Sequence, residues 1–227
     1  MAIILAKIFS HKVIIRSNTS PSKYISNFLK KILFKIFFKF ADQIVVNSNE
    51  FKKIFYQFFN IHANVIYNIL EKKKLNVKKK IHSKKLNILN IGRLTDQKNQ
   101  ILLVKSLMKL DKKIPWSLKI IGRGYNYKIL KDLILKNNLN KKIKLLGYKK
   151  NPYVYLKKAN LFILSSNYEG LPNVLIEAQS CGIPIISSDC ETGPKEILLN
   201  GKLGYLFSSG NIDSLKNKIE YVFNNRQ

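Results

Sequence analysis

The chain has 227 residues, 46% of them hydrophobic, and its 41 Lys and Arg against 13 Asp and Glu give a net charge of +28. This length can bury the core of one large or two small globular domains, and no run of eighteen apolar residues is present that could span a membrane. The two cysteines and three scattered histidines show no metal-binding pattern, so we expect a reduced, cytoplasmic protein without a metal.

The excess of positive charge has two explanations. Clustered cations concentrate phosphate groups from solution, which favours a polyanionic partner. Alternatively, the genome favours Lys, Asn and Ile codons, as the abundance of these residues indicates. Aromatic residues do not interleave with the basic ones as a base-stacking surface requires, so nucleic acid is a minor hypothesis.

The first segment, residues 1–70, alternates between strands and helices. Its apolar start, Met1–Ile8, is too short for a signal peptide, and we interpret it as the end of a strand or helix. Ser48 or Asn49 is placed to cap the second helix. The elements expected in this segment are strand Lys12–Arg16, helix Lys23–Phe40, strand Gln43–Val46, helix Glu50–Phe59 and strand Val65–Tyr67.

The helix expected at Lys23–Phe40 is amphipathic. Its apolar stripe has two interpretations: packing against the protein's own sheet, which the continuity of the stripe favours, or contact with an anionic membrane surface. Phe34 and Phe38 fall off the stripe and are the best argument for a lipid contact. The stripe comprises Ile25, Phe28, Leu29, Ile32, Leu33, Ile36, Phe37 and Phe40, and the lysines opposite it are Lys30, Lys31, Lys35 and Lys39.

Residues 71–85 read EKKKLNVKKKIHSKK, and because like charges extend such a segment we expect a linker there. From residue 86 onward, short apolar strands alternate with amphipathic helices, which predicts a parallel sheet covered on both faces in a domain of residues 86–227. The strands expected are Leu86–Ile91, Ser117–Ile121, Ile143–Leu146, Leu161–Ser165 and Pro184–Ser188. The helices expected lie near Asn99–Leu110, Tyr127–Asn137, Tyr153–Lys158, Pro172–Cys181, Pro194–Leu199 and Asp213–Phe223.

Gly92, Arg93 and Lys98 follow the first strand of this domain, and ligands of such sheets bind at the carboxyl ends of the strands. The glycine lets the backbone approach a ligand, Arg93 supplies a planar fork for a phosphate, and Lys98 supplies a point charge at the next helix start. Both cations are placed to reach one pyrophosphate. Alternatively, they are two ordinary surface cations among the 41 Lys and Arg of the chain.

Glycines follow the second and third strands as well. Residues 122–125, Gly-Arg-Gly-Tyr, form a tight turn at the edge of the expected cleft, and a structural role is favoured for them. After the third strand, Gly147 and Tyr148 offer exposed main chain beside an aromatic ring, which suits a uracil or another base.

The strongest signal is EGLPNVLIE, residues 169–177. Pro172 suits the first position of a helix, whose free amides and positive dipole end favour a diphosphate. Glu177 lies five residues into that helix, roughly 7–8 Å along its axis, which is about the reach from a phosphate to its ribose. Because a carboxylate accepts two hydrogen bonds from a vicinal diol, Glu177 suits the ribose and Glu169 suits the transferred sugar. The residues expected around the diphosphate at the helix start are Gly170, Leu171 and Asn173.

The runs GRLTDQKN, SSNYEGLPNVLIEAQSCGIPIISSD and GP with KEIL closely resemble, in that order, the carboxyl-terminal half of the retaining glycosyltransferases of family four. Their signature is a pair of glutamates separated by seven residues, which Glu169 and Glu177 match. The resemblance covers about residues 12–207. It implies an α/β, GT-B-like fold with a complete carboxyl-terminal Rossmann-like domain and a partial amino-terminal, acceptor-side domain.

The same resemblance implies a function. The chain would transfer a sugar with retention from a nucleotide-sugar, such as a UDP-sugar, to a polysaccharide or lipid-linked oligosaccharide at the inner face of the cytoplasmic membrane. Arg93 and Lys98 would contact the donor diphosphate, Glu169 the sugar and Glu177 the ribose. The first three would be the catalytic groups, and the two cations with the helix start would neutralise the leaving diphosphate without a metal or other cofactor.

Two alternatives stay open. Family members begin with a whole Rossmann-like domain that carries a glycine-rich loop, whereas residues 1–70 resemble only its later part. The chain can therefore also be interpreted as an inactive remnant, or as one half of a split enzyme whose partner is a complementing amino-terminal chain. The second alternative, a nucleic-acid-binding protein, rests on charge alone.

Overall fold

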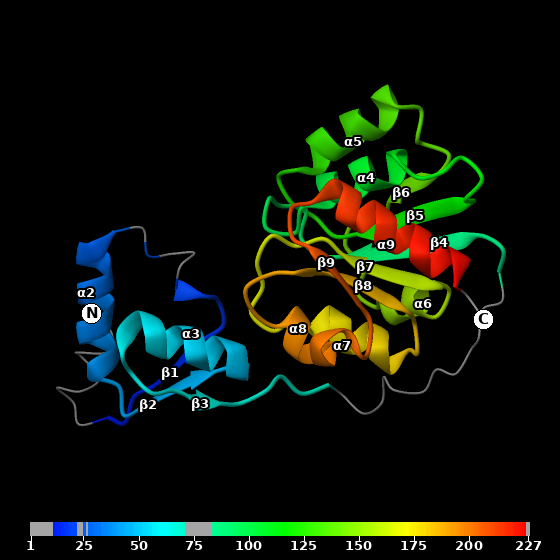
Figure 1. Cartoon of the computed structure of the whole chain (residues 1–227). Helices are drawn as coiled ribbons and strands as arrows, with labels where there is room; N and C mark the ends of the chain where they lie inside the picture. The colour runs from blue at the N-terminus through cyan, green and yellow to red at the C-terminus, as the bar shows by residue number, and fades with distance from the viewer. Residues whose placement is uncertain (1–10, 22–24, 26, 71–82, 226–227) are drawn as a thin grey trace. The chain divides into compact units, whose positions relative to one another are not determined.

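The computed structural model describes residues 11–21, 25, 27–70 and 83–225 (Figure 1). The chain forms two compact units, one of Met1–Ile69 with Glu169–Leu171 and one of Leu70–Tyr168 with Pro172–Gln227. The expectation for Met1–Ile8 and most of the lysine-rich linker lie outside the described residues. None of the described helices is both long and apolar enough to cross a bilayer.

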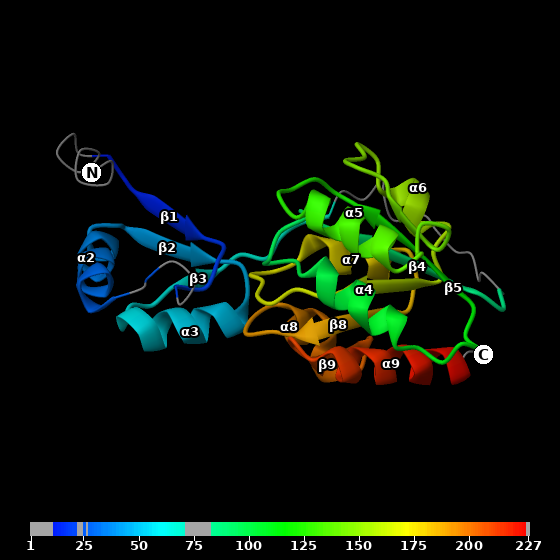
Figure 2. The same ribbon diagram turned by 90° about the horizontal axis from the view of Figure 1, so that it is seen from above.

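The amino-terminal unit is built on a three-stranded parallel sheet in the order β1-β2-β3 (Figure 2). The expected order of strands and helices is confirmed, and Ser48 caps the second helix, since its hydroxyl accepts a hydrogen bond of 3.1 Å from the Phe51 amide. The elements are β1 Ile14–Ser17, α2 Phe28–Lys39, β2 Gln43–Val46, α3 Asn49–Phe59 and β3 Asn64–Val65.

Helix α2 packs through the face opposite to the one that the sequence pattern favoured. Phe38 is only 7% exposed, with its ring centre 4.9 Å from that of Phe59, and Phe34 is partly buried beside it. By contrast, Phe28 and Leu29 of the stripe are 74% and 76% exposed. The core interpretation therefore holds for Ile25, which is buried, but is wrong for the exposed residues of the stripe, and the lipid contact for Phe34 and Phe38 is wrong as well. Apolar residues occur around most of α2, so their spacing alone could not tell which face meets the phenylalanines of α3.

The second unit is built on a six-stranded parallel sheet in the order β6-β5-β4-β7-β8-β9. Each strand is joined to the next by a helical crossover, as short apolar strands separated by amphipathic helices predict. The elements are β4 Leu86–Ile91, α4 Gln100–Met108, β5 Trp116–Ile121, α5 Tyr127–Lys136, β6 Ile143–Leu145, α6 Tyr153–Leu156, β7 Leu161–Leu164, α7 Asn173–Ser180, β8 Ile185–Asp189, α8 Pro194–Ile197, a 3-10 turn at Leu199–Gly201, β9 Tyr205–Ser208 and α9 Ile212–Asn224.

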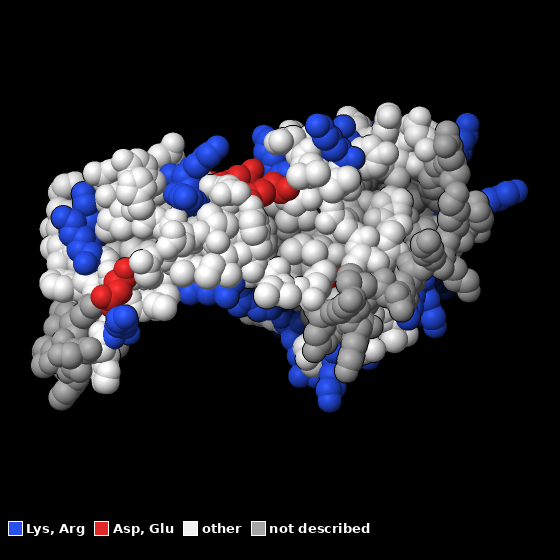
Figure 3. Space-filling model, turned by 90° about the horizontal axis from the view of Figure 1, so that it is seen from below, with Lys and Arg blue, Asp and Glu red and all other residues white. Residues whose placement is uncertain are grey.

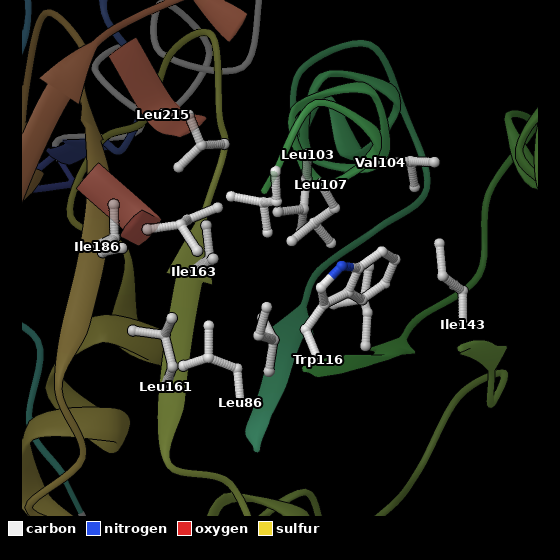
Figure 4. Packing of buried hydrophobic residues seen from close by; sticks show 14 of the residues in the cluster. Leu86, Leu103, Val104, Leu107, Trp116, Ile143, Leu161, Ile163, Ile186 and Leu215 are labelled. Atoms are coloured by element: carbon white, nitrogen blue, oxygen red, sulfur yellow. The ribbon is translucent and has the colours of Figure 1, made fainter. Parts of the chain in front are cut away.

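Helices cover both faces of this sheet (Figure 1). On one face, residues of α4, α5 and α9 pack against alternate residues of the strands, and Trp116, Leu103 and Ile163 belong to this buried cluster (Figure 4). On the other face, α6 and α7 pack against the intervening residues, such as Leu89 and Phe162. The side chains of each strand thus alternate between two cores, which fixes the register of the strands and the position of the loops that follow them.

Two local features differ from the expectation. Strand β9 was not predicted, because its apolar run is only Tyr205, Leu206 and Phe207. Helix α7 begins at Asn173 with Pro172 as its N-cap, one residue later than expected. The proline still ends the preceding loop, because its fixed φ, here −73°, is compatible with a helix entry.

Candidate functional site

A cavity of about 890 Å³ opens at the carboxyl ends of β4, β5 and β6. The loops that follow these three strands line it, together with the start of α6 and one residue of α7, Glu177. Its volume falls in the range of small-molecule sites in proteins, roughly 300–1,000 Å³.

The cavity lies beside the point in the sheet where the order of strand addition reverses. From β4 the chain builds outward to β5 and β6, and then returns to add β7, β8 and β9 on the other side of β4. The ladder between β4 and β7 ends at the pair Leu89 and Phe162, beyond which the Asn90 side chain donates a hydrogen bond of 2.8 Å to the Ile163 carbonyl. Such reversal points are where open α/β sheets form ligand crevices.

Three loops are held side by side by main-chain hydrogen bonds. The Gly92 amide donates to the Ile121 carbonyl at 2.9 Å, and the Gly122 amide donates to the Gly147 carbonyl at 3.0 Å. A Cβ at Gly122 would lie 1.8 Å from the Gly92 carbonyl oxygen, and its φ is 153°. Gly122 therefore has the structural role that was favoured, and it also lines the cavity.

Arg93 is positioned by a short chain of polar contacts. Its Nη2 donates to Gln97 Oε1 at 3.1 Å, and Gln97 Nε2 donates in turn to the Tyr168 carbonyl at 3.1 Å. The Arg93 carbonyl accepts a hydrogen bond of 3.0 Å from the buried Gln100 side chain. The guanidinium is exposed, and the residue lines the cavity, so its donor groups are available to an anion.

The lining is strongly basic, with a single carboxylate among the described residues. Arg123 has its guanidinium carbon 5.8 Å from the centre of the Tyr148 ring, and that ring is exposed. The combination suits an anion that also carries a flat ring and hydroxyl groups, because the cations attract charge, the ring offers a stacking face and the acid accepts from hydroxyls. The cations are Arg93, Arg123, Lys149, Lys150 and Lys157, and the acid is Glu177.

Helix α7 presents Glu177 from a buried base. Leu175 and Ala178, on either side of it, are fully buried, so the helix cannot rotate without disturbing the core. The Ser180 hydroxyl donates to the Glu177 carbonyl at 2.7 Å. Pro172, the N-cap, has no side-chain acceptor for the first amides of the helix. Other groups or a bound anion therefore accept the hydrogen bonds of these amides.

One turn further along, Cys181 lies in the core beneath the site, and burial raises the pKa of its thiol above the ordinary value. The thiolate is the reactive species, so at pH 8 the folded protein holds less of it than a free cysteine does. We expect both Cys181 and the likewise buried Cys190 to react with a chromogenic disulfide reagent at least about a hundredfold more slowly in the folded protein than in denaturant. Fast labelling of one thiol in the folded protein would contradict this environment.

The structure brings four of the residues expected at the site to the cavity: Gly92, Arg93, Tyr148 and Glu177. Lys98 does not line it but lies alongside, since a Cβ built at Gly92 would be 3.3 Å from the aliphatic carbons of the lysine. Asn173 is exposed at the first position of α7. The remaining three, Glu169, Gly170 and Leu171, are buried, group with the amino-terminal unit and are not among the lining residues.

Several lining residues were not selected from the sequence. Lys149, Lys150 and Lys157 follow β6 or end α6, and Arg123 stands in the turn after β5. Lys and Arg side chains occur in several separate groups on the described surface, as Figure 3 shows for one face, so their type alone does not single them out. For Arg123, Lys149 and Lys150 the position after a strand end was the available signal, and it was used for Arg93 but not for these three; Lys157 has no such signal.

Comparison with known proteins identifies the family. Residues 71–227 match the family model described as glycosyl transferases group 1. An uncharacterized glycosyltransferase of Methanocaldococcus jannaschii is 39% identical over 217 residues, which cover 86% of this chain and 53% of that protein. A Campylobacter jejuni enzyme, N-acetylgalactosamine-N,N'-diacetylbacillosaminyl-diphospho-undecaprenol 4-alpha-N-acetylgalactosaminyltransferase, is 31% identical over 224 residues, covering 93% of this chain and 61% of that enzyme.

A solved structure gives the fold. HepE of Anabaena, crystallised in complex with UDP, superposes on all of this chain with a TM-score of 0.84 at 19% identity, and 66% of its own chain is covered. This likeness supports the α/β, GT-B-like architecture with its parallel sheets. The chain spans about half to three fifths of the length of the two curated relatives described above. The family match extends over more than half of the chain, and the chain therefore belongs to the group 1 glycosyl transferases.

Proposed function

We propose that the chain binds a UDP-sugar through the cavity at the ends of β4, β5 and β6 and transfers the sugar, with retention, to a glycan or lipid-linked acceptor. The observation that carries the proposal is the composition of that cavity. Five cations and one carboxylate surround it at the carboxyl ends of parallel strands, next to a tyrosine ring. A nucleoside diphosphate offers the matching groups: two phosphates, a ribose diol and a flat base.

In this proposal the diphosphate lies against Arg93, with Lys98 and the first amides of α7 nearby, the ribose hydroxyls donate to Glu177, and the base faces Tyr148. The resemblance assigns the transferred sugar to Glu169, whose side chain is buried and is not among the residues that line the cavity. Charge neutralisation by fixed cations and helix amides stabilises the leaving diphosphate, so the proposed reaction uses no metal. Retention and membership of family four rest on the resemblance of the Glu169 and Glu177 pair.

The acceptor class comes from the relatives. The Campylobacter enzyme acts, by its name, on a diphospho-undecaprenol-linked sugar, and a Salmonella relative is a lipopolysaccharide 1,6-galactosyltransferase. These names support an acceptor that is part of a lipid-linked or cell-surface glycan. A second candidate function is binding of the donor without transfer by the chain alone, because all residues that line the cavity belong to the second unit.

Titration calorimetry with UDP, UMP, uridine and ADP tests the donor site. We expect UDP to bind more tightly than UMP by about tenfold or more, since each additional charged phosphate gains charge-assisted hydrogen bonds. ADP should bind more weakly than UDP if the base is recognised. Equal affinities for UDP and uridine would contradict the diphosphate site.

Turnover separates the two candidate functions. The purified chain, given a UDP-sugar and a membrane extract, should release UDP and incorporate radiolabelled sugar if it is the transferase. The split enzyme would be favoured by a different result: the chain binds UDP tightly but transfers no sugar, and transfer begins when a separately expressed amino-terminal domain of a relative is added.

A further inference from the structure

Strands β4 and β7 lie side by side at the middle of the six-stranded sheet, but the ladder between them is short (Figure 1). Two residue pairs join them, whereas six pairs join β4 to β5. Asparagine side chains continue the connection along the boundary: Asn160 just before β7, Asn90 near the end of β4, and Asn167 beyond the end of β7. Side-chain amides suit this task, because each offers both donors and an acceptor.

Asn167 ties the loop after β7 to the loop after β4. Its Nδ2 donates to the Asp96 carbonyl at 2.7 Å, and its Oδ1 accepts from Asn99 Nδ2 at 2.9 Å. Its main-chain amide donates to the Gln97 carbonyl at 2.8 Å. One residue therefore holds three positions of a four-residue stretch that begins the crossover to α4.

This stretch supports both cations of the proposed diphosphate site. Lys98 belongs to it, and Gln97 holds Arg93, since Gln97 Oε1 accepts from Arg93 Nη2 at 3.1 Å. Gln97 Nε2 donates at 3.1 Å to the carbonyl of Tyr168, the residue after Asn167. A guanidinium only donates and a carbonyl only accepts, so the group between them has to do both, as an amide does. The orientation of the guanidinium thus depends on the spacing of the two loops.

We infer that Asn167 is a positioning residue of the donor site, which sets this spacing and so holds Arg93 and Lys98 where β4 and β7 part. The inference rests on the proposed function, because it assigns the diphosphate to these cations. Asn167 is exposed and does not line the cavity, so it acts on the donor through the loop after β4. Cations that are held before the anion arrives lose little freedom on binding, which raises the affinity.

Asn160 provides a matched control at the opposite end of the same two strands. Its Nδ2 donates to the Lys85 carbonyl at 2.8 Å, and its Oδ1 accepts from the Asn87 amide at 2.7 Å. Asn160→Ala therefore removes the same kinds of side-chain hydrogen bond as Asn167→Ala. The difference is their place, because neither Asn160 nor its two partners line the donor cavity or follow a strand end that does.

UDP titrations of these variants test the inference. We expect Asn167→Ala to bind UDP about three- to tenfold more weakly than the unchanged chain, and Asn160→Ala to bind it equally well. In the Arg93→Ala background, adding Asn167→Ala should lower the affinity by less than about twofold, because the guanidinium that it positions is gone. Gln97→Met removes the acceptor for Arg93 at similar side-chain length and should reproduce the loss. Urea unfolding of each variant verifies that the fold is kept.

A second measurement needs no ligand. The chain has four arginines, so the Nε–Hε signal of Arg93 can be assigned in a nitrogen-15 spectrum by its loss in Arg93→Ala. We expect this group to be ordered in the unchanged chain and in Asn160→Ala. In Asn167→Ala and in Gln97→Met it should be more mobile on the picosecond to nanosecond timescale, which relaxation measurements report.

The inference is overturned if Asn167→Ala leaves either the UDP affinity or the mobility of Arg93 unchanged. It is also overturned if Asn160→Ala weakens UDP binding to the same extent, or if the losses from Asn167→Ala and Arg93→Ala simply add. Failure of the unchanged chain to bind UDP would end the proposed function instead. The mobility of Arg93 in the unliganded chain would then still decide whether Asn167 positions it.

Discussion

Replacing Arg93 by Ala lowers the affinity for UDP by about 10- to 100-fold, because a charge-assisted hydrogen bond to a phosphate contributes about 1.5–3 kcal/mol. The Arg93 side chain is already held by Gln97, and its main chain is held by Gln100, so little ordering is required when the anion arrives. Calorimetric titration with UDP measures the change. Lys131→Ala, an exposed cation of α5 outside the cavity, is the control and should leave the affinity unchanged.

Glu177→Gln extends the same test to the ribose. The amide keeps the size of the side chain but removes the charge and one acceptor, so UDP affinity should fall by about tenfold. Asp132→Asn on α5, also exposed and outside the cavity, is its matched control. If Arg93→Ala and Glu177→Gln both bind UDP as tightly as the unchanged chain, these two residues do not form the donor site.

Gly122→Ala destabilises the second unit by about 3–5 kcal/mol, the largest stability effect that we expect for a single methyl group. The added Cβ would lie 1.8 Å from the Gly92 carbonyl oxygen, and backbone atoms on both sides cannot move without breaking the bonds to Ile121 and Gly147. Urea unfolding, followed by circular dichroism, measures the change. UDP binding should be lost as well, since the Gly92 and Gly122 loops both line the cavity.

Gly210→Ala separates the clash from backbone strain. Gly210 has a φ of 77°, but a Cβ there would meet open space, so the substitution should cost only about 1–2 kcal/mol. A stability loss for Gly122→Ala no greater than that of Gly210→Ala would show that the contact between the two glycine loops is looser than the structure indicates.

The elements of the second unit were predictable because each carries a consistent signal. Strand β4, for example, was predicted with its observed limits at Leu86 and Ile91, since a short apolar run ends at a glycine and is followed by a helix pattern. Strand β9 lacks that signal. A run of only three apolar residues does not distinguish a strand from a loop, and it is the pairing with β8 that makes these residues a strand. Local sequence therefore specifies a strand well where the run is long and flanked by turns.

The packing face of α2 shows a different limit. Phe38 is buried, and Phe34 is partly buried, because the rings of α3, among them Phe55 and Phe59, lie on that side. Nothing in the spacing of apolar residues along α2 contains this information, because it is a property of the partner helix. A helix that is apolar around most of its circumference needs its neighbours before its faces can be assigned.

The candidate site was predictable where loop position and residue chemistry agree. Arg93 and Glu177 were selected because one follows a strand end and the other belongs to a motif, and both line the cavity. Lys157 was not selected: it is the C-cap of the short helix α6, and only the packing of α6 into the core that α7 shares brings it to the cavity. When a side chain reaches the cavity only through the packing of its helix, its sequence neighbours do not reveal that position.

A crystal structure of the chain with UDP tests the central claim most directly, namely that the cavity at the ends of β4, β5 and β6 is the donor site. We predict density for the diphosphate against Arg93, with the ribose hydroxyls within hydrogen-bonding distance of Glu177 and the uracil next to Tyr148. UDP bound elsewhere on the chain, or an empty cavity at saturating UDP, would contradict it.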